Sequence, residues 1–150
     1  MKLAQALQER ADLNTRIRQL TSRLTNNALV QEGEKPAEDP TKLLKELNEC
    51  VDRLEELIGR INLTNARTTV DGRSLTELIA RKDALHTRIA SYRSLLEQAS
   101  RTAARATRSE IKILSTVNVS KLQKDVDEMS KELRTVENTI QESNWLTELL

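Results

Sequence analysis

Aromatic residues, glycine and proline are scarce in this sequence. Its 150 residues include no phenylalanine, three glycines and two prolines, and aromatic residues make up 1%. So few turn-forming residues exclude a loop-rich or all-β fold. The lack of large rings disfavours a thick globular core, whereas abundant Ala, Glu, Lys, Leu and Arg at helical spacing indicate long helices with narrow apolar seams.

Cysteine, long apolar runs and net charge are equally limited. Cys50 is the only cysteine, so no intrachain disulfide forms and a reducing compartment is expected. No run of about 18 apolar residues could span a membrane, and charged residues soon follow Met1, which disfavours a secretory signal. The net charge of +1 gives no strong field to attract nucleic acid or an anionic membrane. We expect a soluble cytoplasmic protein.

Residues 119–140 carry the clearest pattern in the chain. Their apolar residues follow alternating three- and four-residue steps, which keep one narrow stripe facing a partner helix, as in a coiled coil. This helix-four seam consists of Val119, Leu122, Val126, Met129, Leu133, Val136 and Ile140. Their burial contributes roughly 10–20 kcal/mol, whereas ordering about 25 residues costs roughly 25–50 kcal/mol of backbone entropy. Other helices must therefore stabilise this one.

The sequence predicts one all-α domain over residues 1–150, with four long helices in an antiparallel bundle or coiled coil and a minor β element. The helices are expected at about 3–28, 40–66, 74–107 and 119–144. Short extended segments are expected near 29–31, 68–70 and 110–117, where β-branched residues alternate or break the helical period. The last of these should pair with one of the other two, or across a subunit boundary.

Several local signals fix the expected helix starts. Asp39 precedes a proline and can cap the second helix. An Asp-Gly turn at 71–72 precedes a capping box that begins at Ser74. Asn118 or Ser120 can cap the fourth helix. Adjacent apolar pairs predict that the second helix is the most buried of the four, with Gly59 giving room for close helix contact.

Charge alternates in sign along the expected helices. Residues 81–112 carry eight basic and three acidic side chains, a balance of +5, whereas residues 32–60 carry nine acidic and five basic ones, a balance of −4. The first helix is also basic and the fourth acidic. Because exposed ion pairs contribute at most ~1 kcal/mol each, we interpret this pattern as a determinant of partner choice and register.

Eight short stretches, spread in order over nearly the whole chain, resemble a small bacterial family labelled septicolysin, a domain of unknown function. They lie at 1–7, 26–34, 36–40, 61–65, 70–72, 109–113, 115–117 and 144–145. The resemblance implies a bacterial, largely helical protein and transfers no catalytic residue. The label suggests a cytolysin, although the sequence shows neither a secretion signal nor a membrane-inserting segment.

Catalytic and metal-binding patterns are not evident. Cys50 lies on an apolar stripe, as a small buried hydrophobe would, and His86 is expected to flank a seam in a structural role. No Glu-x-x-His pair and no glycine-rich phosphate loop occur. We therefore expect no enzyme activity, no metal and no cofactor.

Two other features are candidate interaction sites. The first is a basic series spaced four, three and four residues apart, which would line one face of an extended third helix: Arg101, Arg105, Arg108 and Lys112. It suits either a salt-bridging face, which we favour, or a track for anions or nucleic acid. The second is Trp145, which can anchor an interface or close the end of the bundle.

The function expected from these patterns is structural. Narrow seams leave apolar surface for another copy, which predicts a self-assembling homo-oligomer that scaffolds an unknown protein partner. The alternative is a module that binds anions or nucleic acid through the basic series. Membrane disruption is a weaker alternative that comes from the family label alone.

Overall fold

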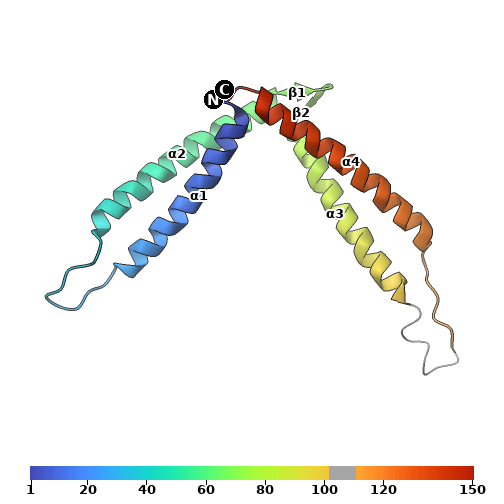
Figure 1. The fold of residues 1–150 in the computed structure, drawn as a ribbon, viewed down its shortest axis with the longest axis horizontal. Coiled ribbons are helices and arrows are strands. Elements are labelled where there is room, and N and C mark those ends of the chain that lie inside the picture. Colours follow the sequence, from blue (N-terminus) through green and yellow to red (C-terminus); the bar gives the residue numbers. More distant parts are fainter. Residues whose placement is uncertain (102–110) are drawn as a thin grey trace. The chain divides into compact units, whose positions relative to one another are not determined.

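Four long helices and one two-stranded sheet make up the chain in this computed structural model, which describes residues 1–101 and 111–150 (Figure 1). The helices are α1 (Leu3–Asn26), α2 (Pro40–Arg67), α3 (Leu75–Ala99) and α4 (Val119–Leu146). The strands are β1 (Thr69–Val70) and β2 (Arg73–Ser74). The predicted all-α class, with four helices and a minor β element, is confirmed. Helix α3 ends at Ala99 rather than near residue 107, and residues 102–110 lie outside the described part.

The chain forms two compact units, each built around a pair of helices. The first unit comprises residues 1–74 and 143–150, and the second comprises residues 75–142. Helix α1 lies beside α2 in the first unit, and α3 lies beside α4 in the second (Figure 1).

Ion pairs between α1 and α2 show that these helices are antiparallel. Glu9 accepts hydrogen bonds from Arg53, with the Nε–Oε1 distance at 2.7 Å, and Arg16 pairs with Glu46. The partner number falls as the α1 number rises, which requires opposite directions. The expected contact between basic α1 and acidic α2 is present in the Arg16 pair, while the Arg53 pair has the opposite polarity.

The core of the second unit contains side chains from both of its helices. Ile89 and Leu96 of α3 are buried with Val126 of α4. Around them pack Tyr92, Val119, Leu122, Met129 and Leu133. Of the two other seam residues, Ile140 is buried and Val136 is half-buried. All seven residues of the helix-four seam thus avoid full exposure, as the burial of a narrow apolar stripe against a second helix requires.

Local capping fixes the starts of two helices. The carboxylate of Asp39 accepts a hydrogen bond from the N–H of Thr41 at 3.0 Å, and Pro40 occupies the first helical position. At the start of α4, the side-chain oxygen of Asn118 accepts from the N–H of Lys121 at 3.0 Å. Of the two predicted caps, Asn118 is therefore the one that the chain uses.

The extended segments differ from the prediction in their pairing. Strand β1 pairs with β2 across the predicted turn, where Asp71 and Gly72 both have positive φ, at 50° and 79°. Such a two-residue turn joins antiparallel neighbours directly, so Thr69 and Val70 pair with Ser74 and Arg73 rather than with the predicted segment near residues 111–117. Residues 29–31 and 111–117 form no strand, and residue 110 lies outside the described residues. The alternation of β-branched residues in 111–117 was therefore a misleading signal.

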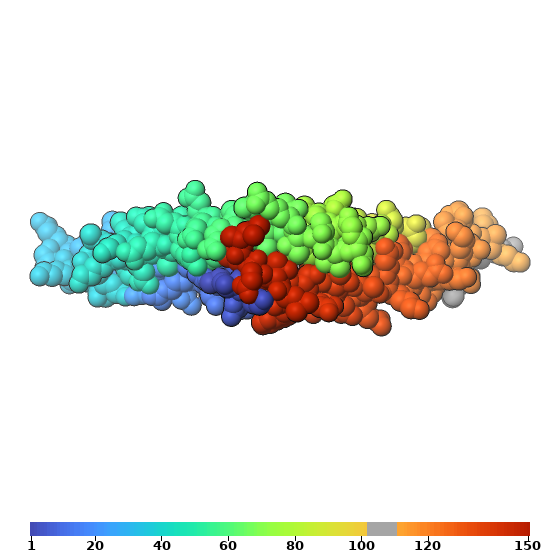
Figure 2. Space-filling model, turned by 90° about the horizontal axis from the view of Figure 1, so that it is seen from above, coloured from blue at the N-terminus to red at the C-terminus, as the bar shows by residue number. Residues whose placement is uncertain are grey.

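The two chain ends are joined in the first unit. Leu3 donates its N–H to the carbonyl of Thr147 at 2.9 Å, and Leu149 donates to the carbonyl of Met1 at 2.8 Å. The Glu148 carboxylate pairs with the ammonium of Lys2 at 2.7 Å. Figure 2 shows the C-terminal residues (red) against the N-terminal ones (dark blue).

Candidate functional site

One flank of α2, next to its buried face, presents an aliphatic stripe to solvent. It consists of Leu44, Val51 and Ile58, with exposed fractions of 48%, 43% and 40%. Consecutive members are seven positions apart in the sequence. This is about two helical turns, so the three side chains lie on nearly the same side of the helix. We call these three residues the α2 stripe.

The α2 stripe exists because adjacent apolar residues point to different sides of the helix. Leu43 and Leu57 are buried, whereas their neighbours Leu44 and Ile58 point outward. Successive residues on a helix are rotated by about 100°, so a single partner helix cannot cover both members of a pair. The prediction that α2 would be the most buried helix is wrong, since α3 has five buried residues and α2 has four. The apolar pairs of α2 divide between two faces, and only one of these is covered.

Gly59 and two charged residues, Lys45 and Glu55, border the α2 stripe. A Cβ added at Gly59 would meet no atom of the described residues within 4 Å, so the predicted close helix contact is not made inside this part of the chain. The Lys45 ammonium lies 3.9 Å from the Glu49 carboxylate, with both side chains strongly exposed. Glu55 is exposed too. This border is polar and open to solvent.

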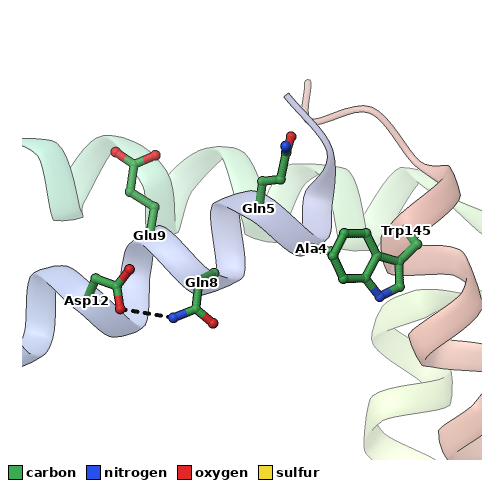
Figure 3. Close-up of a pocket in the computed structure, with 6 residues that line it drawn as sticks. All are labelled: Ala4, Gln5, Gln8, Glu9, Asp12 and Trp145. Atoms are coloured by element: carbon green, nitrogen blue, oxygen red, sulfur yellow. Dashed lines mark hydrogen bonds between the residues drawn. The ribbon is translucent and has the colours of Figure 1, made fainter.

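A shallow groove in the first unit ends at Trp145 (Figure 3). It has a volume of about 380 Å³, and its lining follows two turns of α1: Ala4, Gln5, Gln8, Glu9 and Asp12, with Trp145 from the end of α4. The indole lies beside Ala4 and is 65% exposed. Trp145 is therefore not a buried residue that closes the end of the helix pair, which was one of its two predicted roles.

The polar groups of this groove are mostly engaged already. Gln8 donates its amide to Asp12 at 2.9 Å, and Gln5 accepts from the N–H of Lys2 at 2.8 Å. The hydrogen bond from Arg53 is the main reason that the pKa of Glu9 lies below its ordinary value. No basic side chain lines the groove, so its chemistry suits an apolar or cationic group and not an anion.

The predicted basic series is only partly described. Arg101 follows α3 and pairs with Glu97 at 2.5 Å, and Lys112 is exposed in an irregular segment. Arg105 and Arg108 lie outside the described residues. Because α3 ends at Ala99, neither Arg101 nor Lys112 lies on that helix.

His86 and Cys50 have separate surroundings. The His86 Nε2 atom lies 3.0 Å from a carboxylate oxygen of Glu137, so His86 bridges α3 and α4 at the edge of their seam. Cys50 is half-buried on α2, in the other unit. Within residues 1–101 and 111–150, no three His, Cys, Asp or Glu side chains gather closely enough to hold a metal ion.

No helix in the described ranges combines the length and the apolar character needed to cross a bilayer.

These features define an all-α protein of paired antiparallel helices with an aliphatic stripe on α2. The chain belongs to the family described as "Family of unknown function (DUF6847)", which matches residues 10–149. It is also similar to a solved structure described as a functionally unknown conserved protein from Corynebacterium diphtheriae. The identity is 39% and the TM-score 0.92, over 100% of this chain and 99% of the other. Comparison with curated proteins found no match.

This family assignment corrects the resemblance drawn from the sequence. The match is to a different family, and nothing in the comparisons indicates a septicolysin-like protein. The expectation of membrane disruption came from that label alone and is withdrawn with it.

Proposed function

We propose that this protein is a non-enzymatic helical scaffold that self-associates through the α2 stripe. The observation that carries the proposal is the exposure of Leu44, Val51 and Ile58 on a helix that already packs on α1 through an adjacent face. A seven-residue aliphatic repeat is the pattern by which one helix packs along another. Covering these side chains removes apolar surface from water, which favours association.

Residues 1–101 and 111–150 contain no recognisable reaction centre, and this supports the non-enzymatic part of the proposal. His86 is exposed and engaged with Glu137, and Cys50 is half-buried in the other unit. A nucleophile needs an adjacent base within hydrogen-bond reach, and these two groups do not provide such a pair. A single cysteine also fits action in the cytoplasm, the compartment that we propose.

Self-association is tested by light scattering coupled to size-exclusion chromatography. The wild type should show a mass that rises with concentration between about 1 and about 500 micromolar, the range in which weak interfaces dissociate. Val51→Glu should remain monomeric, because it places a charge in the stripe. Leu95→Glu is a matched control, since Leu95 on α3 has the same exposed fraction of 43%.

Two results would refute the proposal. One is a wild type that remains monomeric over the whole concentration range. The other is an equal loss of association in Leu95→Glu and Val51→Glu.

The alternative function, binding of anions or nucleic acid by the basic series, has weaker support. Arg101 and Lys112 are exposed, but the Arg101 guanidinium is already paired with Glu97. Phosphate contacts weaken steeply with salt, so retention on immobilised DNA or RNA should fall as salt rises. Arg101→Glu should reduce that retention, and retention that is unchanged by the substitution would exclude a role for Arg101.

A further inference from the structure

We infer that two copies pair through α2 in an antiparallel, two-fold manner centred on Val51. This inference rests on the proposed function and adds the identity of the partner surface and its geometry. Leu44 and Ile58 lie seven residues before and after Val51. In an antiparallel pair, Leu44 of one copy therefore meets Ile58 of the other, while Val51 meets its own counterpart. Such an interface is closed and self-complementary, which yields a dimer rather than a filament.

The charged border favours the antiparallel direction over the parallel one. In a parallel pair, Lys45 would face a second lysine, while Asp52 and Glu55 would each face a like carboxylate. In the antiparallel pair, Lys45 lies near Glu55 of the other copy. Asp52 is then the one border residue that lies near a residue of like charge, the Asp52 of the other copy. Opposite charges across an interface set direction and register. Lys45 is free to form this pair, because its contact with Glu49 within the described chain is long, at 3.9 Å.

Gly59 is an independent reason to expect a close neighbour here. A glycine inside a helix is unfavourable relative to alanine, and an added Cβ at Gly59 would meet no described atom within 4 Å. No contact within the described chain explains the glycine. Gly59 directly follows Ile58 and lies on the same side of the stripe as Lys45. Without a side chain at this position, the end of a lysine side chain from the second copy can lie near the α2 backbone.

Disulfide trapping distinguishes these arrangements. In a Cys50→Ala background, Val51→Cys should form a linked dimer under mild oxidation. Leu44→Cys and Ile58→Cys should each fail to link alone but should link when mixed, because a disulfide needs Cα atoms within about 7 Å. Glu49→Cys, on the same helix away from the stripe, is the matched control and should not link.

Each alternative result has a definite meaning. Linking of Leu44→Cys and of Ile58→Cys with themselves would show parallel pairing and overturn the inference. A dimer in light scattering without any of these links would overturn the inference and leave self-association standing. A monomer in light scattering would overturn both.

A charge exchange tests the border separately. Lys45→Glu and Glu55→Lys should each raise the dimer Kd about two- to fivefold, as the loss of an exposed ion pair does. The double variant should restore the wild-type Kd. Equal weakening in the double variant would contradict the antiparallel register.

Discussion

Leu150 donates its backbone N–H to the hydroxyl of Thr64 at 3.0 Å, and this fastens the last residue of the chain to α2. The same hydroxyl donates to the carbonyl of Arg60 at 2.8 Å, and Thr64 is completely buried. A buried hydroxyl that bonds two backbone groups contributes more to stability than an exposed one, because water does not reach its position to replace these bonds.

Replacing Thr64 should therefore destabilise the protein. We expect Thr64→Val to lower the free energy of unfolding by about 1–3 kcal/mol, since it keeps the side-chain shape and leaves the Leu150 N–H without its acceptor. Thr87→Val is the control, because Thr87 is exposed and bonds only the Asp83 carbonyl; it should change stability by less than about 0.5 kcal/mol. Urea denaturation measures both, and equal effects would refute the argument.

Two glycines should respond to alanine in opposite directions. Gly72 has a φ of 79°, which a side chain disfavours, so Gly72→Ala should cost about 1–2 kcal/mol. Gly59 is helical and open, so Gly59→Ala should add about 1 kcal/mol to stability in dilute solution. Thermal and urea denaturation at low protein concentration measure the two changes, and shifts of the same sign would contradict this reasoning.

Substitution of a buried and of an exposed leucine of α2 should change the free energy of unfolding by different amounts. Leu57→Ala should lower the free energy of unfolding by about 2–5 kcal/mol, because Leu57 is fully buried and the variant leaves a cavity. Leu44→Ala should cost less than about 1 kcal/mol in the dilute monomer, because Leu44 is 48% exposed. A large loss for Leu44→Ala under those conditions would mean that the stripe is covered within the chain.

Acid should weaken the contact between the chain ends. Hydrogen bonds from Lys2 and from the N-terminal ammonium hold the pKa of Glu148 below its ordinary value of 4.5. The folded pKa is thus lower than the unfolded one, so the stability from this contact is present above the unfolded value and lost as the pH falls through the folded value. Between pH about 5 and about 3, Glu148→Gln should lose less stability than the wild type.

Glu142→Gln is the control for this pH series, because Glu142 is exposed and no described residue forms an ion pair with it. Its stability should follow the wild-type pH dependence. The argument fails if Glu148→Gln and Glu142→Gln have the same pH profile.

The features predicted correctly from the sequence are those encoded by adjacent residues. Asp39 caps the helix that follows it, and the turn at Asp71 and Gly72 needs only two consecutive residues with positive φ. The expected α2 start and the hairpin turn are present because the chemistry that fixes them is local.

Features that depend on distant contacts were missed or misread. The pairing of Lys2 with Glu148 joins residues from opposite ends of the chain and has no local signature. The α2 stripe did have a signal, the seven-residue spacing of Leu44, Val51 and Ile58. Each of Leu44 and Ile58 directly follows a buried leucine, so spacing alone does not separate the exposed set from the buried one.

The bonded chain ends also affect how this chain could be rearranged. Because Met1 and Leu149 are hydrogen-bonded neighbours, a short peptide could close the chain into a circle, and new ends could be opened in the exposed loop between α1 and α2. The first unit would then keep the same neighbours with a different starting residue. The fold of the first unit depends on the contacts between its segments more than on their order along the chain.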